Sequence, residues 1–552
     1  MSSAFNFSCV SFCALVRPVI HYFLLSSQRL VVLLRNSLYL MDKSTRNRGN
    51  GNGNAYGHTI KYLSIFGGAH GLSVILNVVR TKISCILLGV AGQSIIALSN
   101  RTVQMFSDGT GLSLSLSAVR KIADTYENCD DGSLLKCVKV VRSLAFLTGI
   151  FGMLLMLAVV PLVSDWIFEA SSEYYRSRIM MLSPVVLFMA VSNGEIAILR
   201  GTRRLNAIAS YTLATAIISL IVSVPAYYAM GIGGIFPAIF ITALLQMCVL
   251  LGFSLPQYRY VITPFSLSLL REGLEMVKLG AGYVFASIFT SFSMWLVCAA
   301  LSDIGNGDSA GLFTAGFVMT TLLPGMLFSA LDSEYYPRLS GVAADAERCN
   351  RVVNEQIEVQ LLVQSPLLMA FVVAMPALVP LFYNAEFVPA IAMAQFAMLG
   401  MFMRTMCFPL SFLALSKSDT KVYVSLEAVY NILFVFFIIA GYVLNGMTGV
   451  GIGIALLHTV DFIMVYSVAR YRYGVKLSGN VICSFFVQLP LFVAVVAVAR
   501  LCCIDWVYWI AGVICVLLSV SVTMYMFSRM EVLPKFLLRI MNKFFGWFKK
   551  RV

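Results

Sequence analysis

Charged side chains are scarce in this sequence: they make up 12% of its 552 residues, whereas hydrophobic residues make up 59%. A soluble domain of this composition could not cover its apolar residues with polar surface, so lipid must surround most of the chain. The composition therefore excludes an ordinary soluble enzyme or binding domain and predicts a membrane protein.

Metal-binding and redox motifs are also lacking. The thirteen cysteines include no CxxC pair, and no histidines accompany them at the spacing of metal ligands. The sequence has no large polar segment with paired carboxylates, which an integral glycosyltransferase or ligase would need. Neither an enzyme activity nor a bound cofactor is expected.

Long apolar runs, in contrast, recur along the chain with short breaks between them. Each run holds about twenty residues, enough to cross the hydrocarbon core of a bilayer as a helix. We predict an all-α, polytopic membrane protein with about fourteen transmembrane helices. Their approximate limits are 61–89, 93–117, 143–164, 178–199, 207–229, 233–253, 279–301, 310–331, 360–383, 390–415, 422–444, 449–469, 480–499 and 507–528.

Lysine and arginine concentrate in every second loop. With the N-terminus inside, the basic loops "RGTRRLN", "SKSDTK" and "RYRYGVKLSGN" face the cytoplasm, and the short loops "GVAGQS" and "NGMTG" face outside. This alternation follows the positive-inside rule, with Arg176, Arg178 and Arg500 as exceptions. It predicts that both termini are cytoplasmic, and it explains the net charge of +14 without a nucleic-acid partner.

Several landmarks recur at an offset of about 217 residues, which indicates an internal repeat. Lys61 falls on Lys278, Arg120 falls beside Arg338, and the segment "AILRGTRRL" falls on "LALSKSDTK". An even number of spans separates each pair, so the orientation is preserved. We predict two six-helix lobes related by a parallel repeat, with two C-terminal helices outside it. Chance landmarks in a helical membrane protein are the alternative explanation.

The cytoplasmic ends of the predicted helices carry their own signals. Arg120, Arg203 and Arg338 are expected at these ends, where they would form a cytoplasmic gate. Pro337 is expected to end the helix that precedes Arg338, because proline cannot donate the next backbone hydrogen bond.

The chain is predicted to have five parts. Residues 1–40 hold short apolar runs broken by arginines, and we interpret them as an upstream over-prediction of the start codon; a membrane-surface anchor is the alternative. The parts are an N-terminal cytoplasmic segment (1–57), an N-lobe with spans one to six (58–256), a C-lobe with spans seven to twelve (257–472), two further spans (473–530) and a basic cytoplasmic tail (531–552).

Two arginines in the first two predicted spans reach a similar depth in the membrane. Arg80 lies nine residues before Gly89, and Arg101 lies eight residues after Gln93. At about 1.5 Å per residue, both are roughly 12–14 Å below the outer surface. An ionisable residue within a span costs at least about 2.5–3.5 kcal/mol on insertion scales, so both are expected to face a cavity.

We predict that Arg80, Lys82, Arg101 and Arg404 form one cationic site around this cavity. Arginine pairs bidentately with phosphate oxygens and keeps its charge when desolvated, so a diphosphate is the expected ligand. Lys82 could instead snorkel to the interface or pair with Asp108. Arg101 and Asp108 could form a structural pair, whereas Arg404 has no obvious acidic neighbour in the sequence.

Three residues are candidates for coupling transport to an ion, either Na⁺ or a proton: Asp108, His458 and Asp461. His458 and Asp461 are three residues apart on one helix face, so they could relay a proton, bind sodium or simply bridge helices. Glu427 lies near the predicted inner boundary, where a solvated position is expected.

Six stretches carry a resemblance to a known family. The sequence resembles the polysaccharide flippases of the Wzx, or O-antigen translocase, type in the multidrug/oligosaccharidyl-lipid/polysaccharide exporter superfamily. The resemblance covers about residues 58–480, and it depends on the order and spacing of the stretches. They are "VVRTKISCILLGVAG" (78–92), "GLSLSLSAVRKIAD" (111–124), "AILRGTRRL" (197–205), "SEYYPRLS" (333–340), "LFYNAEFVPA" (381–390) and "YGVKLS" (473–478).

The resemblance implies a V-shaped bundle of two six-helix lobes in the cell inner membrane. It implies transfer of an undecaprenyl-diphosphate-linked oligosaccharide, an O-antigen or exopolysaccharide repeat unit, from the cytoplasmic to the periplasmic leaflet by alternating access. The family's cationic positions in spans one and ten match Arg80 and Arg404, which would meet the diphosphate. The implied partners are this lipid-linked oligosaccharide, membrane lipids and a polysaccharide polymerase complex.

The sequence departs from this family in two respects. Many members of the O-antigen type have twelve spans, whereas about fourteen are predicted here, as in lipid II flippases. Predicted span seven also has no cation that matches Arg80. A lipid II flippase is therefore the nearest alternative. A multidrug antiporter is a further one, but its site should be acidic and aromatic, whereas the predicted site is basic.

Overall fold

The fold is described from a computed structural model of the whole chain, which divides into two compact units, residues 1–65 and 66–552. In the first unit, residues 55–65 form the first turns of a helix. The residues that the structure describes are 55–111, 118–119, 121–123, 125–126, 131–167, 172–202, 204–256, 267–305, 307–343, 345–417, 419–501 and 505–529. The predictions for Arg120, Arg203, residues 1–40 and the tail 531–552 lie outside them.

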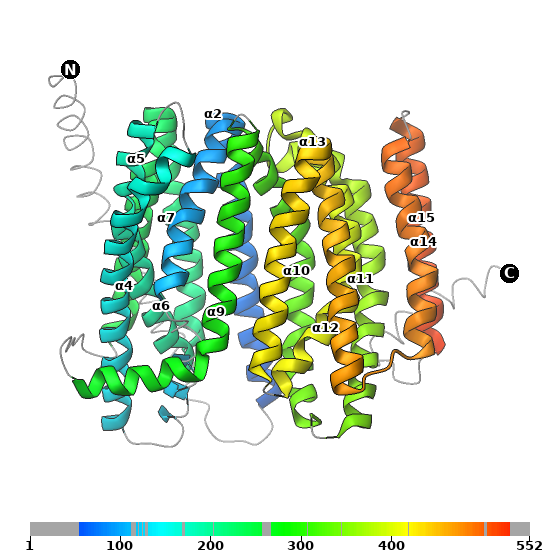
Figure 1. Cartoon of the computed structure of the whole chain (residues 1–552), viewed down its shortest axis with the longest axis horizontal. Helices are drawn as coiled ribbons and strands as arrows, with labels where there is room; N and C mark the ends of the chain where they lie inside the picture. Colours follow the sequence, from blue (N-terminus) through cyan, green and yellow to red (C-terminus); the bar gives the residue numbers. More distant parts are fainter. Residues whose placement is uncertain are drawn as a thin grey trace. The chain divides into compact units, whose positions relative to one another are not determined.

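All regular elements within the described residues are helical, and ten helices are long and apolar enough to cross a membrane (Figure 1). The chain is therefore an all-α, multi-pass membrane protein, as predicted. The elements are α2 (Ala55–Thr110), α4 (Asp131–Ile167), α5 (Ser172–Met180), α6 (Ser183–Gly201), α7 (Leu205–Met230), η1 (Gly231–Gly234), α8 (Ile235–Ser254), α9 (Leu267–Ile304), α10 (Ser309–Gly341), α11 (Ala346–Phe382), η2 (Ala385–Phe387), α12 (Pro389–Ser416), α13 (Thr420–Tyr473), α14 (Gly479–Leu501) and α15 (Asp505–Arg529).

Two of these helices, α2 and α13, are each divided by a non-helical kink. In α2 the kink is at Gly89, with φ 65° and ψ −165°, and in α13 it is at Asn445 and Gly446, with φ 53° at the glycine. Both kinks fall where the sequence predicts a turn between two spans. The count of fourteen spans stays a prediction, because the ten apolar helices are identified by length and composition alone.

The helices pack as two groups. Helix α4 contacts α6, and α6, α7 and α8 contact one another. This set is called the N-half together with α2, which lines one cavity with α6, α7 and α8. Helices α10 to α13 contact one another, and α14 and α15 pack against α11; these are called the C-half. Helix α9 contacts both groups, through α4 on one side and through α10 and α13 on the other (Figure 1). The parallel repeat itself stays a prediction.

Small residues let α12 and the second arm of α13 approach closely. A Cβ atom at Gly451 would lie 2.4 Å from the carbonyl oxygen of Met393, and one at Gly400 would lie 2.9 Å from that of Ile454. Glycine is therefore required at both positions by backbone contact, a common device in membrane helix packing. Both of these helices line the C-half cavity described below.

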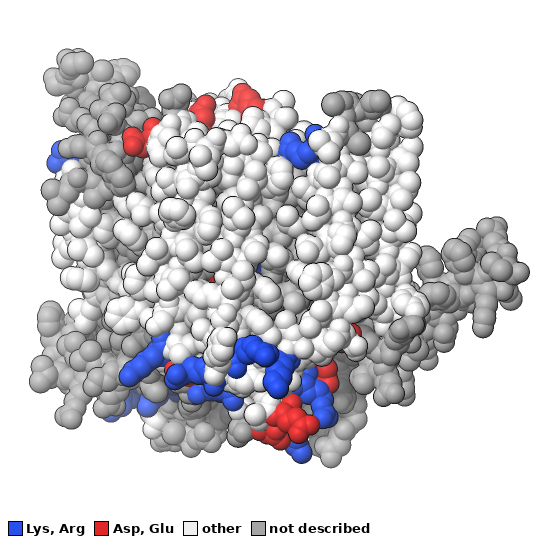
Figure 2. Space-filling view, turned by 45° about the vertical axis from the view of Figure 1, so that its right-hand side comes forward, with Lys and Arg blue, Asp and Glu red and all other residues white. Residues whose placement is uncertain are grey.

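The surface of the molecule has largely uncharged sides and one basic end. Figure 2 shows lysine and arginine gathered near one end of the molecule, with few charges along the sides. Lys421, Arg470 and Arg472 are exposed on the arms of α13 at the end opposite its kink. This end is called the basic end, and the end that holds the kinks at Gly89 and Gly446 is called the closed end for reasons given below.

One sequence expectation about helix ends is wrong. Helix α10 does not stop at Pro337 but continues to Gly341. Proline removes a single backbone donor, and a long membrane helix tolerates this loss where neighbouring groups compensate for it. Arg338 therefore lies on the last turns of α10 rather than in a loop.

Candidate functional site

A central cavity of about 530 Å³ lies between the two arms of α2, α9, α10 and the turn that precedes α12. Arg80 and Thr81 of the first arm of α2 line it, together with Arg101 and Asp108 of the second arm. Ser291 of α9 completes this polar part of the wall. The cavity is therefore built mainly by α2, at the contact between the N-half and the C-half.

Arg80 and Arg101 reach this cavity from opposite arms of α2, because the chain reverses at Gly89. Both line the same cavity, as expected for two residues predicted at a similar depth. Both side chains are half-buried, and neither has an ion pair among the residues that the structure describes. With two arginines and one carboxylate, Asp108, among its described lining residues, this cavity has an excess of positive charge that suits an anion.

Asp108 lies in the same cavity but forms no ion pair with Arg101. Its two carboxylate oxygens each accept a hydrogen bond from Nε2 of Gln104, both at 2.8 Å, and Oδ2 also accepts one from the hydroxyl of Ser291. The suggested Arg101–Asp108 pair is thus replaced by contacts within α2 and to α9. Asp108 fastens α2 to α9 beside the two arginines.

Lys82 is directed away from the central cavity. Its Nζ donates to the carbonyl oxygen of Pro380 at 2.5 Å and to that of Tyr383, at the C-terminal end of α11. The sequence prediction missed this because residues two apart differ by about 200° around a helix, so Arg80 and Lys82 cannot share a face. A cation at a helix C-terminus is favourable, and the structure gives Lys82 this position instead of one in the anion site.

Arg404 lies in a second cavity, called the C-half cavity, with a volume of about 400 Å³. Its guanidinium lies 5.7 Å from the centre of the Phe408 ring. The sequence expectation that Arg404 has no acidic neighbour is wrong, because Glu427 and Asp461 line the same cavity. Both acids come from α13, far from Arg404 in sequence, so helix packing alone brings them together. Glu427 is thus a cavity residue, not a solvated boundary residue.

The two cavities are separated by α9 and α10. Thr290 of α9 lines the C-half cavity, and the adjacent Ser291 lines the central cavity. On α10, Phe317 lines the former and Val318 the latter. The structure therefore does not bring Arg404 into one cavity with Arg80, and the predicted single cationic site is divided in two.

His458 and Asp461 occupy different environments although they share a helix face. Asp461 is 9% exposed and accepts a hydrogen bond of 3.3 Å from the thiol of Cys407. His458 is 3% exposed and stacks on Tyr430 with the ring centres 6.0 Å apart. Its Nδ1 has no hydrogen-bond partner in the described part of the chain. Asp461 therefore faces the C-half cavity, whereas His458 packs behind its wall.

A third cavity, called the N-half cavity, lies between α2, α6, α7 and α8 and has a volume of about 320 Å³. Arg80 lines it as well as the central cavity, so the two cavities meet at this residue. The other polar lining residues described are uncharged amides and hydroxyls. They are Thr81, Ser84, Gln93, Asn100, Gln104, Ser219, Ser223, Tyr227, Thr242 and Gln246.

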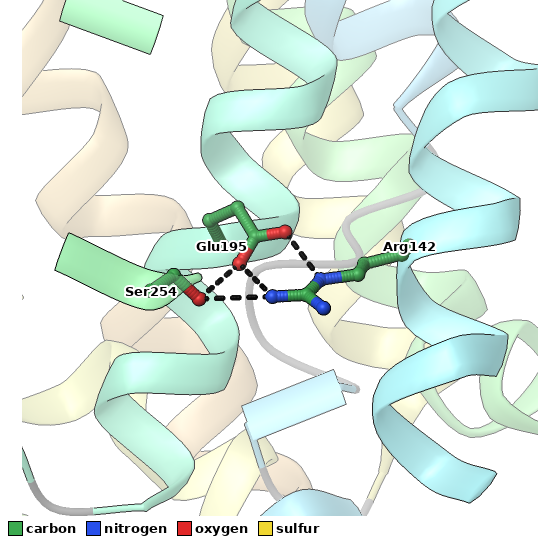
Figure 3. Close-up of polar contacts among 3 residues, drawn as sticks. All are labelled: Arg142, Glu195 and Ser254. Atoms are coloured by element: carbon green, nitrogen blue, oxygen red, sulfur yellow. Dashed lines mark hydrogen bonds and ion pairs between the residues drawn. The ribbon is translucent and has the colours of Figure 1, made fainter. Parts of the chain in front are cut away.

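A buried ion pair joins α4 and α6 in the N-half, and it was not predicted from the sequence (Figure 3). Nε of Arg142 lies 2.6 Å from Oε1 of Glu195, and Nη2 lies 2.9 Å from Oε2, with the two side chains 2% and 1% exposed. Ser254, the last residue of α8, accepts from Arg142 at 3.0 Å and donates to Glu195. The sequence offered one sign of this pair, because the acidic Glu195 lies inside a predicted apolar span and would need a partner there.

Contacts at the closed end fasten the α2 hairpin to the C-half. The backbone N–H of Val90 donates to Oε2 of Glu386 at 3.2 Å, and Nδ2 of Asn384 donates to the carbonyl oxygen of Cys85 at 3.1 Å. The hydroxyl of Ser94 donates to the carbonyl oxygen of Asp308 at 3.0 Å. Together with Lys82, these bonds close the central cavity on that side.

The predicted cytoplasmic gate is described only at Arg338. Its Nη1 lies 3.5 Å from Oε2 of Glu355, and both side chains are exposed. A second pair near the basic end joins Arg472 to Asp419 at 2.7 Å. The hydrogen bond from Arg472 lowers the pKa of the Asp419 carboxyl. These pairs are solvated, so each contributes little to stability.

A family model described as "Polysaccharide biosynthesis protein" matches residues 134–392. This match supports the predicted family. Residues 134–392, a little under half of the chain, are therefore similar to a family of polysaccharide biosynthesis proteins.

Solved structures of transporters of the MOP superfamily share this fold. The chain is similar to "Lipid II flippase MurJ, inward closed conformation", with a TM-score of 0.64 and 14% identity over 84% of this chain and 98% of the other. A multidrug resistance MATE family transporter in an inward-facing conformation gives a TM-score of 0.61 and 14% identity, over 74% of this chain and 94% of the other.

A third structure is that of a MOP superfamily transporter from Pyrococcus furiosus, for which a binding pocket of reverse polarity is described. It gives a TM-score of 0.50 and 15% identity, over 75% of this chain and 94% of the other. No curated protein matches the sequence. At these identities, the structural likeness establishes the fold alone.

Proposed function

We propose that this protein moves an undecaprenyl-diphosphate-linked oligosaccharide, an O-antigen or exopolysaccharide repeat unit, from the cytoplasmic to the periplasmic leaflet of the cell inner membrane. The observation that carries this proposal is the pair Arg80 and Arg101, which line one cavity without a described ion pair. A diphosphate would relieve the repulsion between them and accept bidentate hydrogen bonds from both.

Alternating access would deliver the substrate to each leaflet in turn. With the basic end in the cytoplasm, both termini are cytoplasmic and the closed end faces the periplasm. Opening toward the periplasm then requires rupture of the bonds that Lys82, Asn384 and Glu386 make with their partners at the closed end. The diphosphate and sugars would travel through the wet interior, while the polyprenyl chain stays in lipid.

The C-half cavity suits a coupling ion better than it suits the diphosphate. Glu427 and Asp461 would repel an anion there, and Arg404 supplies a single compensating charge. Binding of a proton or of Na⁺ to one carboxylate would change the charge of this cavity. Asp108, tied to α9 through Ser291, is the corresponding candidate in the central cavity.

A reconstituted system tests the proposal directly. Purified protein in vesicles should move a fluorescent undecaprenyl-diphosphate oligosaccharide between leaflets, as measured by accessibility to a membrane-impermeant quencher. Arg80→Ala and Arg101→Ala should each slow this movement by about tenfold or more, because each removes a charged hydrogen bond of about 1.5–3 kcal/mol. Lys421→Ala, on the exposed surface of α13, is the matched control. Normal rates in both arginine variants would contradict the proposal.

A lipid II flippase is the second candidate, because the fold resembles that of MurJ over nearly the whole of that chain. Competition decides between the two candidates. Excess unlabelled lipid II should leave movement of the oligosaccharide lipid nearly unchanged if the first proposal holds, and should be the better substrate if the second holds. Export of cationic dyes in place of either lipid would favour a multidrug antiporter.

We also propose a polysaccharide polymerase complex as a partner, which would use the oligosaccharide lipid after its transfer to the periplasmic leaflet.

A further inference from the structure

We infer that the N-half cavity is a glycan subsite, which holds the first, uncharged sugar residue attached to the diphosphate. This inference rests on the proposed function, and it names where the sugar binds. Arg80 lines both the central cavity and the N-half cavity, so a phosphate at Arg80 places the next group of the ligand at the entrance to the N-half cavity.

The lining of the N-half cavity matches the chemistry of a neutral sugar. Side-chain amides can both donate and accept, as sugar hydroxyls do, and Gln93, Asn100, Gln104 and Gln246 all line this cavity. Carboxylates are lacking from the described lining, and Arg80 is its charged member. The cavity therefore offers hydrogen bonds without the acidic groups that a cationic drug would need.

Unused hydrogen-bonding capacity points in the same direction. The hydroxyl of Thr242 is buried in this cavity region and has no hydrogen-bond partner among the described residues. Buried polar atoms are normally paired, so this one is expected to bond to water or a ligand. Nε2 of Gln246 donates to the hydroxyl of Ser219 across α8 and α7 at 3.2 Å, which leaves its carbonyl oxygen available as an acceptor.

The size and the apolar wall favour one sugar rather than a whole repeat unit. The volume of about 320 Å³ lies at the lower end of small-molecule sites, which span about 300–1,000 Å³. Ile96, Val185 and Met189 provide an apolar face on which the C–H side of a sugar ring can pack. The remaining sugars would occupy the larger central cavity.

Binding measurements with two kinds of probe test the inference. The probes are undecaprenyl diphosphate without sugar, and a set that carries a single glucose, galactose or N-acetylglucosamine. The protein should bind at least one glycosylated probe more tightly than the bare diphosphate. Gln246→Leu and Thr242→Val should each weaken binding of that glycosylated probe by about three- to tenfold, which is the effect of one lost hydrogen bond. Neither variant should change the affinity for the bare diphosphate. Arg80→Ala should weaken all probes.

Controls separate the failure of this inference from that of the proposed function. Thr212→Val, on α7, removes a hydroxyl that bonds to its own helix at Ile208 and should change neither affinity. If Gln246→Leu fails to fold, the nearly isosteric Thr242→Val provides the result. The inference is overturned if sugar adds no affinity, or if both cavity variants bind every glycosylated probe as the wild type does. Failure to bind even the bare diphosphate would overturn the proposed function itself.

Discussion

The two halves of the molecule bury charge in different ways. In the N-half, Arg142 and Glu195 are locked together by two short hydrogen bonds and almost fully buried. In the C-half, Arg404, Glu427 and Asp461 share a cavity without an ion pair between them in the described structure. Charges that satisfy each other hold a fold together, whereas charges left without a fixed partner can respond to a ligand or an ion.

The largest expected effect comes from breaking the locked pair. Arg142→Met should lower the free energy of unfolding by about 3–5 kcal/mol, because it leaves the carboxylate of Glu195 buried without its cation. Thermal unfolding in detergent measures this loss. The double variant Arg142→Met/Glu195→Leu should recover most of it, since both buried charges are then gone. A single variant as stable as the wild type would show that the pair does not stabilise the N-half.

The corresponding change in the C-half should cost less stability. Arg404→Met breaks no ion pair in the described structure and loses mainly the contact with the Phe408 ring, worth about 0.5–2 kcal/mol. Movement of the lipid-linked oligosaccharide should nevertheless slow, because the two carboxylates lose their compensating charge. The same unfolding and vesicle assays apply. Destabilisation equal to that of Arg142→Met would remove the contrast between the halves.

The two glycine kinks sharpen the comparison further. Both Gly89 and Gly446 have positive φ with ψ of −165° and −142°, a conformation that favours glycine, so alanine at either position should cost about 1–3 kcal/mol in strain. At Gly89 a Cβ would also lie 3.0 Å from Oε2 of Glu386, whereas at Gly446 it would meet open space. Gly89→Ala should therefore lower the unfolding temperature more than Gly446→Ala does. Equal shifts would mean that Glu386 adjusts without cost.

The smallest effect is expected at the exposed surface. Arg338→Ala removes a pair of 3.5 Å whose side chains are 40% and 49% exposed, so the free energy of unfolding should change by less than about 1 kcal/mol. If this variant leaves stability unchanged but slows movement of the lipid, Arg338 acts in the proposed cytoplasmic gate. Unchanged stability and unchanged movement would exclude that role.

The sequence predicted distances along helices well and directions around them poorly. Arg80 and Arg101 were placed at one depth because the rise per residue of a helix is constant, and the structure puts both in the central cavity. Lys82 was assigned to the same site, although its angular position directs it to α11. The all-helical fold was predicted from the apolar runs, because their length and composition indicate helices that cross a lipid bilayer.

Contacts between helices that are distant in sequence could not be predicted. Nothing in one sequence says that α13 packs on α12, so Glu427 and Asp461 were not recognised as neighbours of Arg404. The same limit hid the pair of Arg142 with Glu195, which lies on a different helix. Single-residue signals identified most of the charged positions, but only the packing of helices determines their partners.

Thr290 and Ser291, adjacent residues of α9, border different cavities, so the partition between these chambers is about one helix thick, roughly 10 Å. Across that distance, two unit charges still interact by about 1.7 kcal/mol at an effective dielectric constant of 20. At this closest possible separation, neutralising one carboxylate on one side would alter anion affinity on the other by up to about tenfold. The charge of the C-half cavity can therefore influence anion binding in the central cavity without direct contact between their side chains.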